Sequence, residues 1–125
     1  MPYLKKAFSA DVTVKFFHND APCKASAPLL PEIGINLLNF GVQHTLAEMK
    51  EWTGDRIALL GNIHPRDILA AGTPEDIRRA VNETLDALND HSHLIVSCGG
   101  GMPPDVPTGN IRAMLSAVHK WPRTD

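Results

Sequence analysis

Four short apolar runs recur along the chain, and a segment with helical signals separates each run from the next. The runs cover residues 12–17, 35–40, 56–61 and 93–97. Each is rich in strand-forming side chains or almost continuously apolar, as expected of strands that are buried on both faces. Strands that alternate with helices favour right-handed crossover connections, so the sequence predicts one parallel sheet.

The segments between the runs carry signals for the starts and ends of helices. In the clearest, apolar residues recur at helical spacing behind Thr73, a good N-cap, and Pro74, which suits the first turn. Thr45 and Glu48 have the spacing of a capping box, and Gly54 is the expected end of that helix. The expected helices are 1–9, 45–54, 73–90, 108–121 and a shorter one, limited by two prolines, within 25–34.

The predicted order of strands and helices fits two architectures. Four parallel strands can form a small doubly wound sheet or a piece of a (β/α)₈ barrel. A complete barrel needs about 250 residues, so four of its β/α units correspond to roughly 125 residues. The chain has 125 residues. We therefore expect one α/β domain over residues 1–125, built from four parallel β/α units.

Composition and charge exclude several classes of function. The formal net charge is −2 and the isoelectric point is about 6.3, and the basic residues are scattered. We therefore expect no binding to nucleic acid or to an acidic membrane surface. No apolar run approaches the ~20 residues of a membrane span, and the N-terminal segment lacks the apolar core of a signal peptide. Two distant cysteines favour a reducing, cytoplasmic compartment.

Polar or metal-capable residues follow the end of every predicted strand. In parallel α/β folds, functional groups gather at the carboxyl ends of the strands. This convergence along the chain is more informative than any single residue, and it predicts a pocket at that edge of the sheet. The residues concerned are, in chain order, His18, Asp20, Asn39, Asn62, His64, Ser97, Cys98, Gly99 and Gly100.

The residue types alone leave several alternatives open. His18 and Asp20 could bind a divalent metal such as zinc, or could form a hydrogen-bonded pair that braces a loop. Cys98 could be a thiolate ligand or a nucleophile, although a lone cysteine after an apolar strand is more often a small buried side chain. His64 could carry protons or cap a loop. The glycines at 99–101 could hold an anion or, more commonly, form a turn.

Three motifs resemble, in order and spacing, the C-terminal portion of the uroporphyrinogen decarboxylase family. They are FFHNDAPCKASAPLLPEIGINLLNFG, GNIHPRDILAAGTPEDIRRAV and HLIVSCGGGMPPDVPTGNIRAMLSAVHKW. The resemblance runs over essentially the whole chain. It implies the complete (β/α)₈ barrel of that family, of which this chain corresponds to the C-terminal half.

The resemblance implies one of two activities. Decarboxylases of the family remove acetate carboxyls from uroporphyrinogen without a cofactor, whereas cobalamin-linked methyltransferases move methyl groups between a corrinoid protein and a thiol or tetrahydrofolate. The thiol-using methyltransferases bind zinc through a His-x-Cys pair and a later Cys, at positions that match His18, Asp20 and Gly100 here, with Cys98 two residues before the last. Decarboxylases carry a His at the position of Gly100 and an Asp at the position of His64.

We therefore predict the C-terminal half of a TIM-type barrel with a pocket for a tetrapyrrole or a corrinoid-linked substrate. The expected catalytic residues are His18, Asp20 and His64, and the expected ligands of a zinc ion, if one is used, are His18, Asp20 and Cys98. The expected substrate-binding residues are Asn39, Asn62, Ser97, Gly99 and Gly100. Because a half-barrel has two open sheet edges, we expect self-association or docking onto a complementary N-terminal half-barrel. The alternative is a non-catalytic fragment that needs such a partner.

Overall fold

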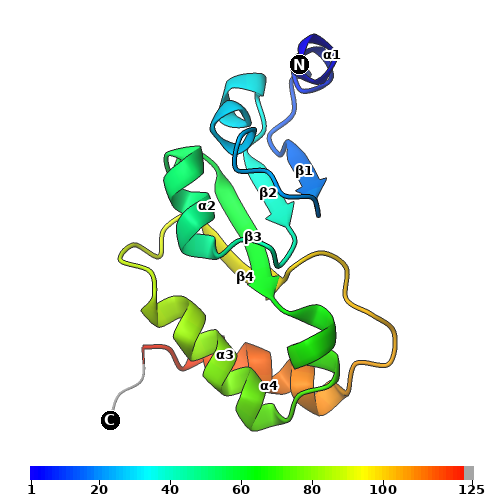
Figure 1. Cartoon of the computed structure of the whole chain (residues 1–125), viewed down its shortest axis with the longest axis vertical. Coiled ribbons are helices and arrows are strands. Elements are labelled where there is room, and N and C mark those ends of the chain that lie inside the picture. Colours follow the sequence, from blue (N-terminus) through cyan, green and yellow to red (C-terminus); the bar gives the residue numbers. More distant parts are fainter. Residues whose placement is uncertain (123–125) are drawn as a thin grey trace.

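The computed structural model describes residues 1–122 and contains one four-stranded sheet in the order β1-β2-β3-β4 (Figure 1). Every neighbouring pair of strands is parallel, and helices connect successive strands along the chain. The predicted α/β half-barrel of four parallel units is therefore confirmed. The strands are β1 (Phe16–Asn19), β2 (Leu37–Phe40), β3 (Ala58–Ile63) and β4 (Leu94–Cys98).

Strand β1 begins later than the apolar run at 12–17 predicts. The side chain of Asn36 holds this segment instead: its amide nitrogen donates to the carbonyl of Thr13 at 2.8 Å, and its oxygen accepts from the N–H of Lys15 at 2.7 Å. Backbone groups that bond to a side chain do not join the strand ladder. The register of β1 therefore begins at Phe16, which lies opposite Leu37.

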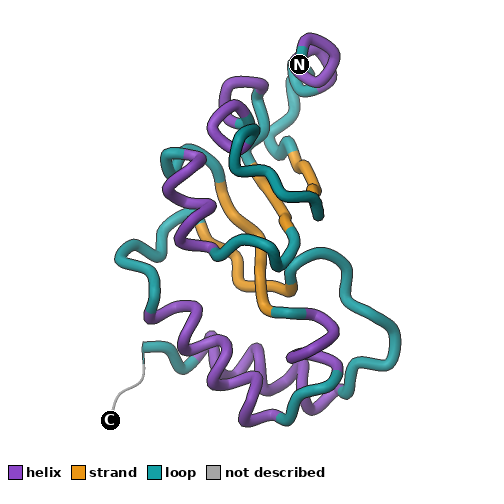
Figure 2. The backbone as a smooth tube through the Cα atoms, viewed as in Figure 1, coloured by secondary structure: helices purple, strands orange, loops and turns teal. Residues whose placement is uncertain are grey.

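The four α-helices lie close to their predicted positions (Figure 2). Thr45 forms the expected capping box with Glu48, and Gly54 ends α2 in the left-handed conformation at φ 65°. Thr73 caps α3 and forms a second capping box with Asp76. These side chains satisfy backbone N–H groups that the first turn leaves free. The helices are α1 (Pro2–Ala7), α2 (Leu46–Thr53), α3 (Pro74–Asp86) and α4 (Thr108–His119).

Three features of the helices differ from the predictions. Helix α3 ends before residue 90, because the N–H of Leu88 bonds to the carbonyl of Leu85 in a tighter turn. The expected helix within 25–34 is split into two short 3₁₀ turns, η1 (Ala27–Leu29) and η2 (Pro31–Ile33), because each proline lacks the N–H that a longer helix needs. A further short helix, η3 (Pro65–Ala70), follows β3 and was not predicted.

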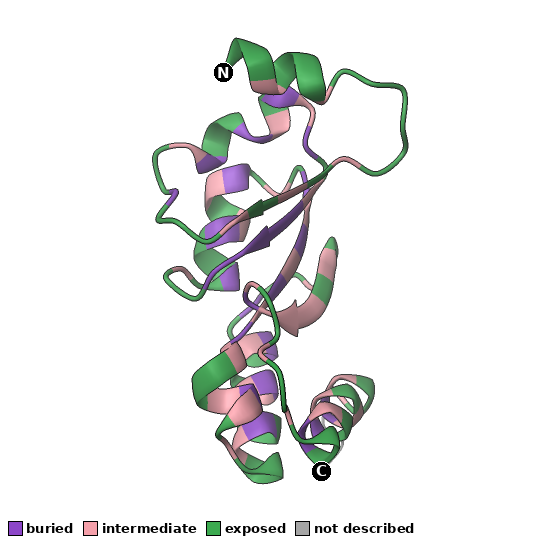
Figure 3. Cartoon of the chain, turned by 90° about the vertical axis from the view of Figure 1, so that its right-hand side faces the viewer, coloured by how far each residue is buried: buried purple, intermediate pink, exposed green. Residues whose placement is uncertain are grey.

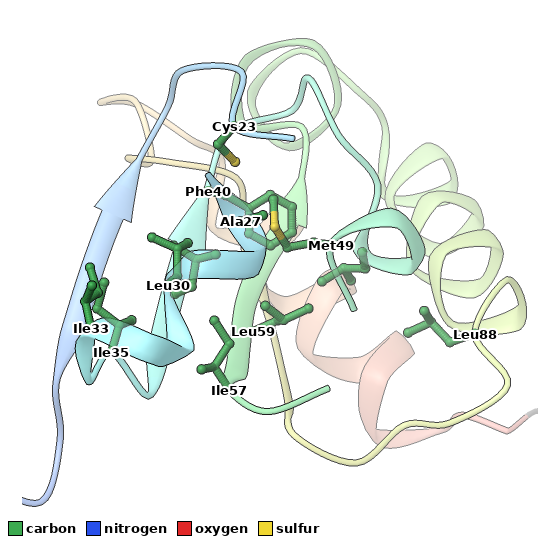
Figure 4. Close-up of a cluster of buried hydrophobic side chains, with 12 residues drawn as sticks. Cys23, Ala27, Leu30, Ile33, Ile35, Phe40, Met49, Ile57, Leu59 and Leu88 are labelled. Carbon is green, nitrogen blue, oxygen red and sulfur yellow. The ribbon is translucent and has the colours of Figure 1, made fainter. Parts of the chain in front are cut away.

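The hydrophobic core lies on one face of the sheet, in three clusters. The largest joins the sheet to α2, η1 and η2, and Figure 4 shows its side chains, among them Phe40, Met49 and Leu59. The two smaller clusters join β3 and β4 to helices α3, α4 and η3, with Ile63 and Leu69 at their centres. Helices α3 and α4 also pack directly against each other.

The opposite face of the sheet is largely open. Phe16 and Ile95 lie on the two edge strands and are 47% and 49% exposed, whereas Leu38 and Leu59 on the covered face are at most 1% exposed. Figure 3 shows exposed and half-buried residues along the edge strands and mostly buried residues along the central strand β2. This open face corresponds to the inner wall of an eight-stranded barrel, of which the described sheet supplies four strands.

Candidate functional site

The strand register brings the predicted site residues to one edge of the open face. His18 lies opposite Asn39, Asn39 lies opposite Leu60, and Asn62 lies opposite Ser97. Because side chains alternate between the two faces of a strand, His18, Asn39 and Ser97 belong to the face that the helices leave uncovered. The side chain of Asn62 turns to the loop after β2 and lines a cavity beside α3. The predicted gathering of polar residues at this edge is present.

His18 is held between two oxygen atoms. Its Nδ1 lies 2.7 Å from Oδ1 of Asn39, and its Nε2 lies 3.0 Å from Oδ2 of Asp20. The side chains of His18 and Asp20 are 40% and 63% exposed, so a ligand on the open face can reach both. The structure therefore contains the hydrogen-bonded pair that was one of the two interpretations of the sequence.

Asn39 is the buried centre of this arrangement. The residue is only 6% exposed. Its Nδ2 donates to the carbonyl of Leu60 at 2.7 Å and to the carbonyl of Cys98 at 3.3 Å, while its Oδ1 faces His18. One side chain on β2 thus bonds to residues on β1, β3 and β4, so the amide fixes the relative positions of all four strands at the edge where the site lies.

Two glycines leave room for the carboxylate of Asp20. A Cβ built at Gly100 would lie 2.8 Å from Oδ1 of Asp20, and one built at Gly41 would lie 3.2 Å from the same atom. Gly100 also has a φ of 78°, in the left-handed region that side chains rarely adopt. The loops after β2 and β4 can therefore approach Asp20 closely because each has a glycine there. A side chain at position 100 would point towards Asp20.

Asn62 braces the loop after β2. Its Nδ2 donates to the carbonyl of His44 at 2.6 Å and to that of Gly41 at 3.3 Å. His44 is itself anchored, since its Nε2 accepts from the N–H of Cys23 at 3.2 Å and its ring packs edge-on against Trp52. The side chain of Asn62 thus joins β3 to the loop after β2, and the residue lines the cavity between that loop and helix α3.

Two cavities open at the same edge, and His64 lines both of them. One has a volume of about 260 Å³ and lies beside Asp20, Gln43 and Arg66. The other has a volume of about 300 Å³ and lies between the loop after β2 and helix α3, where it includes Glu83. His64 and Gly99 were predicted from the sequence, and both line the first cavity.

Arg66 and Glu83 were missed as site residues. Arg66 comes two residues after His64 in the unpredicted helix η3, and the strand-end position of His64 was the signal that could have found it. Glu83 lies in the middle of α3. Only the packing of α3 beside the loop after β2 brings it to the cavity, and nothing in its local sequence indicates this.

Cys98 does not join His18 and Asp20. It packs against the buried cluster formed by Leu69, Ile77 and Ala113 on the helix-covered side of the sheet, and its thiol donates to the carbonyl of Gly100 at 3.3 Å. This placement corresponds to the interpretation of Cys98 as a small packing side chain.

The residues placed by the structure give no complete donor set for zinc. Within residues 1–122, no group of three or more His, Cys, Asp or Glu side chains is arranged to hold a metal ion. His18 and Asp20 supply two donor side chains, and Cys98 faces the other side of the sheet. Zinc binding therefore stays a prediction.

The second cysteine lies away from the site. Cys23 is 3% exposed, and burial raises the pKa of its thiol, an effect that a hydrogen bond with Asn19 partly opposes. A thiol of this kind is mostly protonated at neutral pH and reacts slowly. Cys23 is therefore part of the core rather than of the pocket.

Comparison with known proteins gives a consistent result. The family model described as uroporphyrinogen decarboxylase (URO-D) matches residues 1–121. Among the relatives, a uroporphyrinogen decarboxylase from Legionella pneumophila is 33% identical over 73% of this chain and 25% of its own length. Another from Dichelobacter nodosus is 31% identical over 96% of this chain and 34% of its own length. The chain thus spans between a quarter and a third of these relatives.

A solved structure shares the fold. A methyltransferase from Methanosarcina mazei superposes with a TM-score of 0.83 and 21% sequence identity, over 96% of this chain and 35% of that chain. At this identity the match establishes the architecture alone. Within residues 1–122, the structure contains no helix with the length and apolar character of a membrane span.

Proposed function

The chain belongs to the uroporphyrinogen decarboxylase family, and from that membership we propose that it forms the C-terminal half of a barrel whose pocket acts on a tetrapyrrole. The observation that carries this proposal is the His18–Asp20 pair, which stands on the open face of the sheet beside a cavity of about 260 Å³. A barrel enzyme binds substrate at this edge of its strands, and relatives named uroporphyrinogen decarboxylase align with most of the chain.

The polar groups at the site suit a substrate that carries carboxylates. Arg66 lines the cavity beside His64, and a guanidinium can bind a carboxylate through two parallel hydrogen bonds. When doubly protonated, His18 can donate to a substrate oxygen in place of Asp20. A pyrrole ring protonated on a ring carbon can accept the electron pair that an acetate arm releases when it loses carbon dioxide. A proton then adds to the remaining methylene carbon, and the ring loses the proton that it had gained. His18 and Asp20 are the pair that we assign to this proton transfer.

The remaining predicted residues take supporting roles in the proposal. Asn62 and Ser97 lie opposite each other on β3 and β4, near the carboxyl ends of both strands. Gly99 and Gly100 let the loop after β4 approach the pocket closely. His64 stands where both cavities meet, in a position to exchange protons with a bound substrate.

The proposed activity needs a second half-barrel. The apolar part of the open face includes the half-exposed side chains of Phe16 and Ile95, which a second half-barrel would bury. A second copy of the chain, related by a two-fold axis along the barrel, would place β4 of each copy beside β1 of the other in parallel and give eight strands. A complementary N-terminal half-barrel would cover the same face, and a fragment without either partner would bind ligand at most.

Methyl transfer is the second candidate. His18 and Asp20 have the sequence spacing of the His-x-Cys zinc pair that the resemblance implies, with Asp20 at the position of the Cys. Because Cys98 is turned to the other side of the sheet, a third zinc ligand would have to come from the other half of the barrel. This candidate therefore depends on the partner even more than decarboxylation does.

An assay of the chain alone, and of the chain mixed with an N-terminal half-barrel of a family relative, tests the proposal. We expect conversion of uroporphyrinogen to coproporphyrinogen, a loss of about 10²–10⁴-fold for His18→Gln, and no loss for His93→Gln, because His93 precedes β4 at the far edge of the sheet. Equal loss in both variants, or no conversion in any mixture, would contradict it. Thiol methylation that stops when zinc is chelated would favour the second candidate.

A further inference from the structure

We propose that Asn39 is a positioning residue that fixes His18 with its proton on Nδ1, so that Nε2 is the nitrogen available to a ligand. This inference rests on the proposed function only in that His18 serves the pocket. It assigns Asn39 a different role from the expected one, since the side chain acts through His18 and does not meet substrate itself. The inference rests on the three hydrogen bonds of the Asn39 side chain and on its burial.

The orientation of the Asn39 amide follows from its neighbours. Its Nδ2 faces two carbonyl oxygens, those of Leu60 at 2.7 Å and Cys98 at 3.3 Å. A carbonyl oxygen only accepts, so the amide atom that faces both must be the nitrogen, which has two N–H groups to donate. If the amide were reversed, its oxygen would lie against the carbonyl oxygens of Leu60 and Cys98, and none of the three could donate a hydrogen. Asn39 Oδ1 is therefore the atom that faces His18.

The protonation of the His18 ring follows in turn. Asn39 Oδ1 can only accept, and it lies 2.7 Å from His18 Nδ1, so Nδ1 must carry a hydrogen and donate it. The hydrogen bond at one ring nitrogen decides the state of the other. In the contact with Asp20, 3.0 Å away, Nε2 also carries a hydrogen and donates it, because a carboxylate oxygen only accepts. The neutral ring with its hydrogen on Nδ1 presents the Nε2 lone pair only when a ligand has displaced that carboxylate. In both forms the ligand-facing atom is Nε2.

Burial separates the roles of the three residues. Asn39 is 6% exposed, whereas the side chains of His18 and Asp20 are 40% and 63% exposed. A ligand on the open face can displace the exposed Asp20 carboxylate from Nε2, but it cannot reach the Nδ1 side without breaking three buried hydrogen bonds. The same amide also donates to the carbonyl of Cys98. Asn39 therefore holds both the start of the glycine loop after β4 and the ring of His18.

Nitrogen NMR of the full chain with labelled histidine tests this directly. At a pH where the ring is neutral, we expect His18 to show a protonated Nδ1 and an unprotonated Nε2. Asn39→Leu removes the acceptor and should shift His18 towards the Nε2–H form that an unrestrained imidazole prefers. A wild-type His18 in the Nε2–H form, or an unchanged tautomer in Asn39→Leu, would overturn the inference.

Asn110 provides a matched control. It is also a buried amide, 4% exposed, and its Nδ2 donates to the carbonyls of Leu69 and Gly72. Asn110→Leu removes two buried hydrogen bonds away from His18, so the tautomer should stay as in the wild type. If Asn39→Leu does not fold, the wild-type spectrum alone still decides the assignment. Because the readout needs no turnover, a chain that shows Nδ1–H but is inactive in every mixture with a second half-barrel would contradict the proposed function and leave the role of Asn39 intact.

Discussion

The two faces of the sheet differ in how completely this chain covers them. On the helix-covered face, Leu38, Phe40 and Leu59 are at most 1% exposed. On the open face, Phe16 and Ile95 are about half exposed at 47% and 49%. The helices cover the first face and complete its hydrophobic core. The open face carries apolar and polar side chains, as the interior of a barrel does, but the strands that would face them are not in this chain. The first face holds the packed core, and the second carries the proposed site.

The largest effect that this contrast predicts is on unfolding. Leu59→Ala should lower the free energy of unfolding by about 2–5 kcal/mol, because the cavity it leaves lies in a packed core. Ile95→Ala, on the open face, should change the free energy of unfolding by about 0.5 kcal/mol or less when the protein is dilute enough to be monomeric. Denaturant titration of both variants measures the difference. Similar losses in the two variants would show that the open face is already covered.

A smaller effect is expected at the glycines of the loop after β4. Gly100→Ala should cost about 1–2 kcal/mol, because the residue has a φ of 78° and side chains disfavour the left-handed region. It should also move the carboxylate of Asp20, which lies 2.8 Å from the added Cβ. Gly101→Ala is the control, since nothing lies within 4 Å of a Cβ built there. Equal thermal stability of the two variants would contradict the placement of this loop.

The smallest effect concerns the cap of α3, far from the open face. Thr73→Ala should cost about 1 kcal/mol through the lost N-cap. Hydrogen bonds from the backbone and the hydroxyl of Thr73 hold the pKa of Asp76 below its ordinary value of 3.8, with Arg79 adding a smaller effect. The stabilisation from Asp76 is thus present above that value and is lost as the pH falls through the lowered pKa of the folded state. Thermal unfolding between pH 6 and 2 should show a weaker pH dependence in Thr73→Ala, and an unchanged profile would contradict the link.

The sequence predicted those parts of the molecule that local signals determine. The four apolar runs identified the strands, and the capping residues Thr45 and Thr73 marked the helix starts correctly. The rule that functional groups follow the carboxyl ends of parallel strands predicted the edge of the sheet at which His18 and Asp20 lie. In contrast, the side of the sheet that Cys98 faces depends on register, since a shift of one residue reverses it.

The central role of Asn39 could not be seen in the sequence. Its amide meets carbonyls from two other strands and a ring from a third, and this depends on how the strands pair rather than on any residue near it in the chain. The start of β1 was mispredicted for a similar reason, because Asn36 competes for the backbone of Thr13 and Lys15. Long-range pairing decided both outcomes.

The central claim is that the open face needs a second half-barrel, and the most direct measurement is sedimentation of the isolated chain over a range of concentrations. We predict reversible association into dimers, and a monomeric Ile95→Glu variant, because a charge on the open face opposes its burial. Arg112→Glu, on the exposed surface of α4, is the control and should associate like the wild type. A wild-type chain that stays monomeric and folded at all concentrations would contradict the claim.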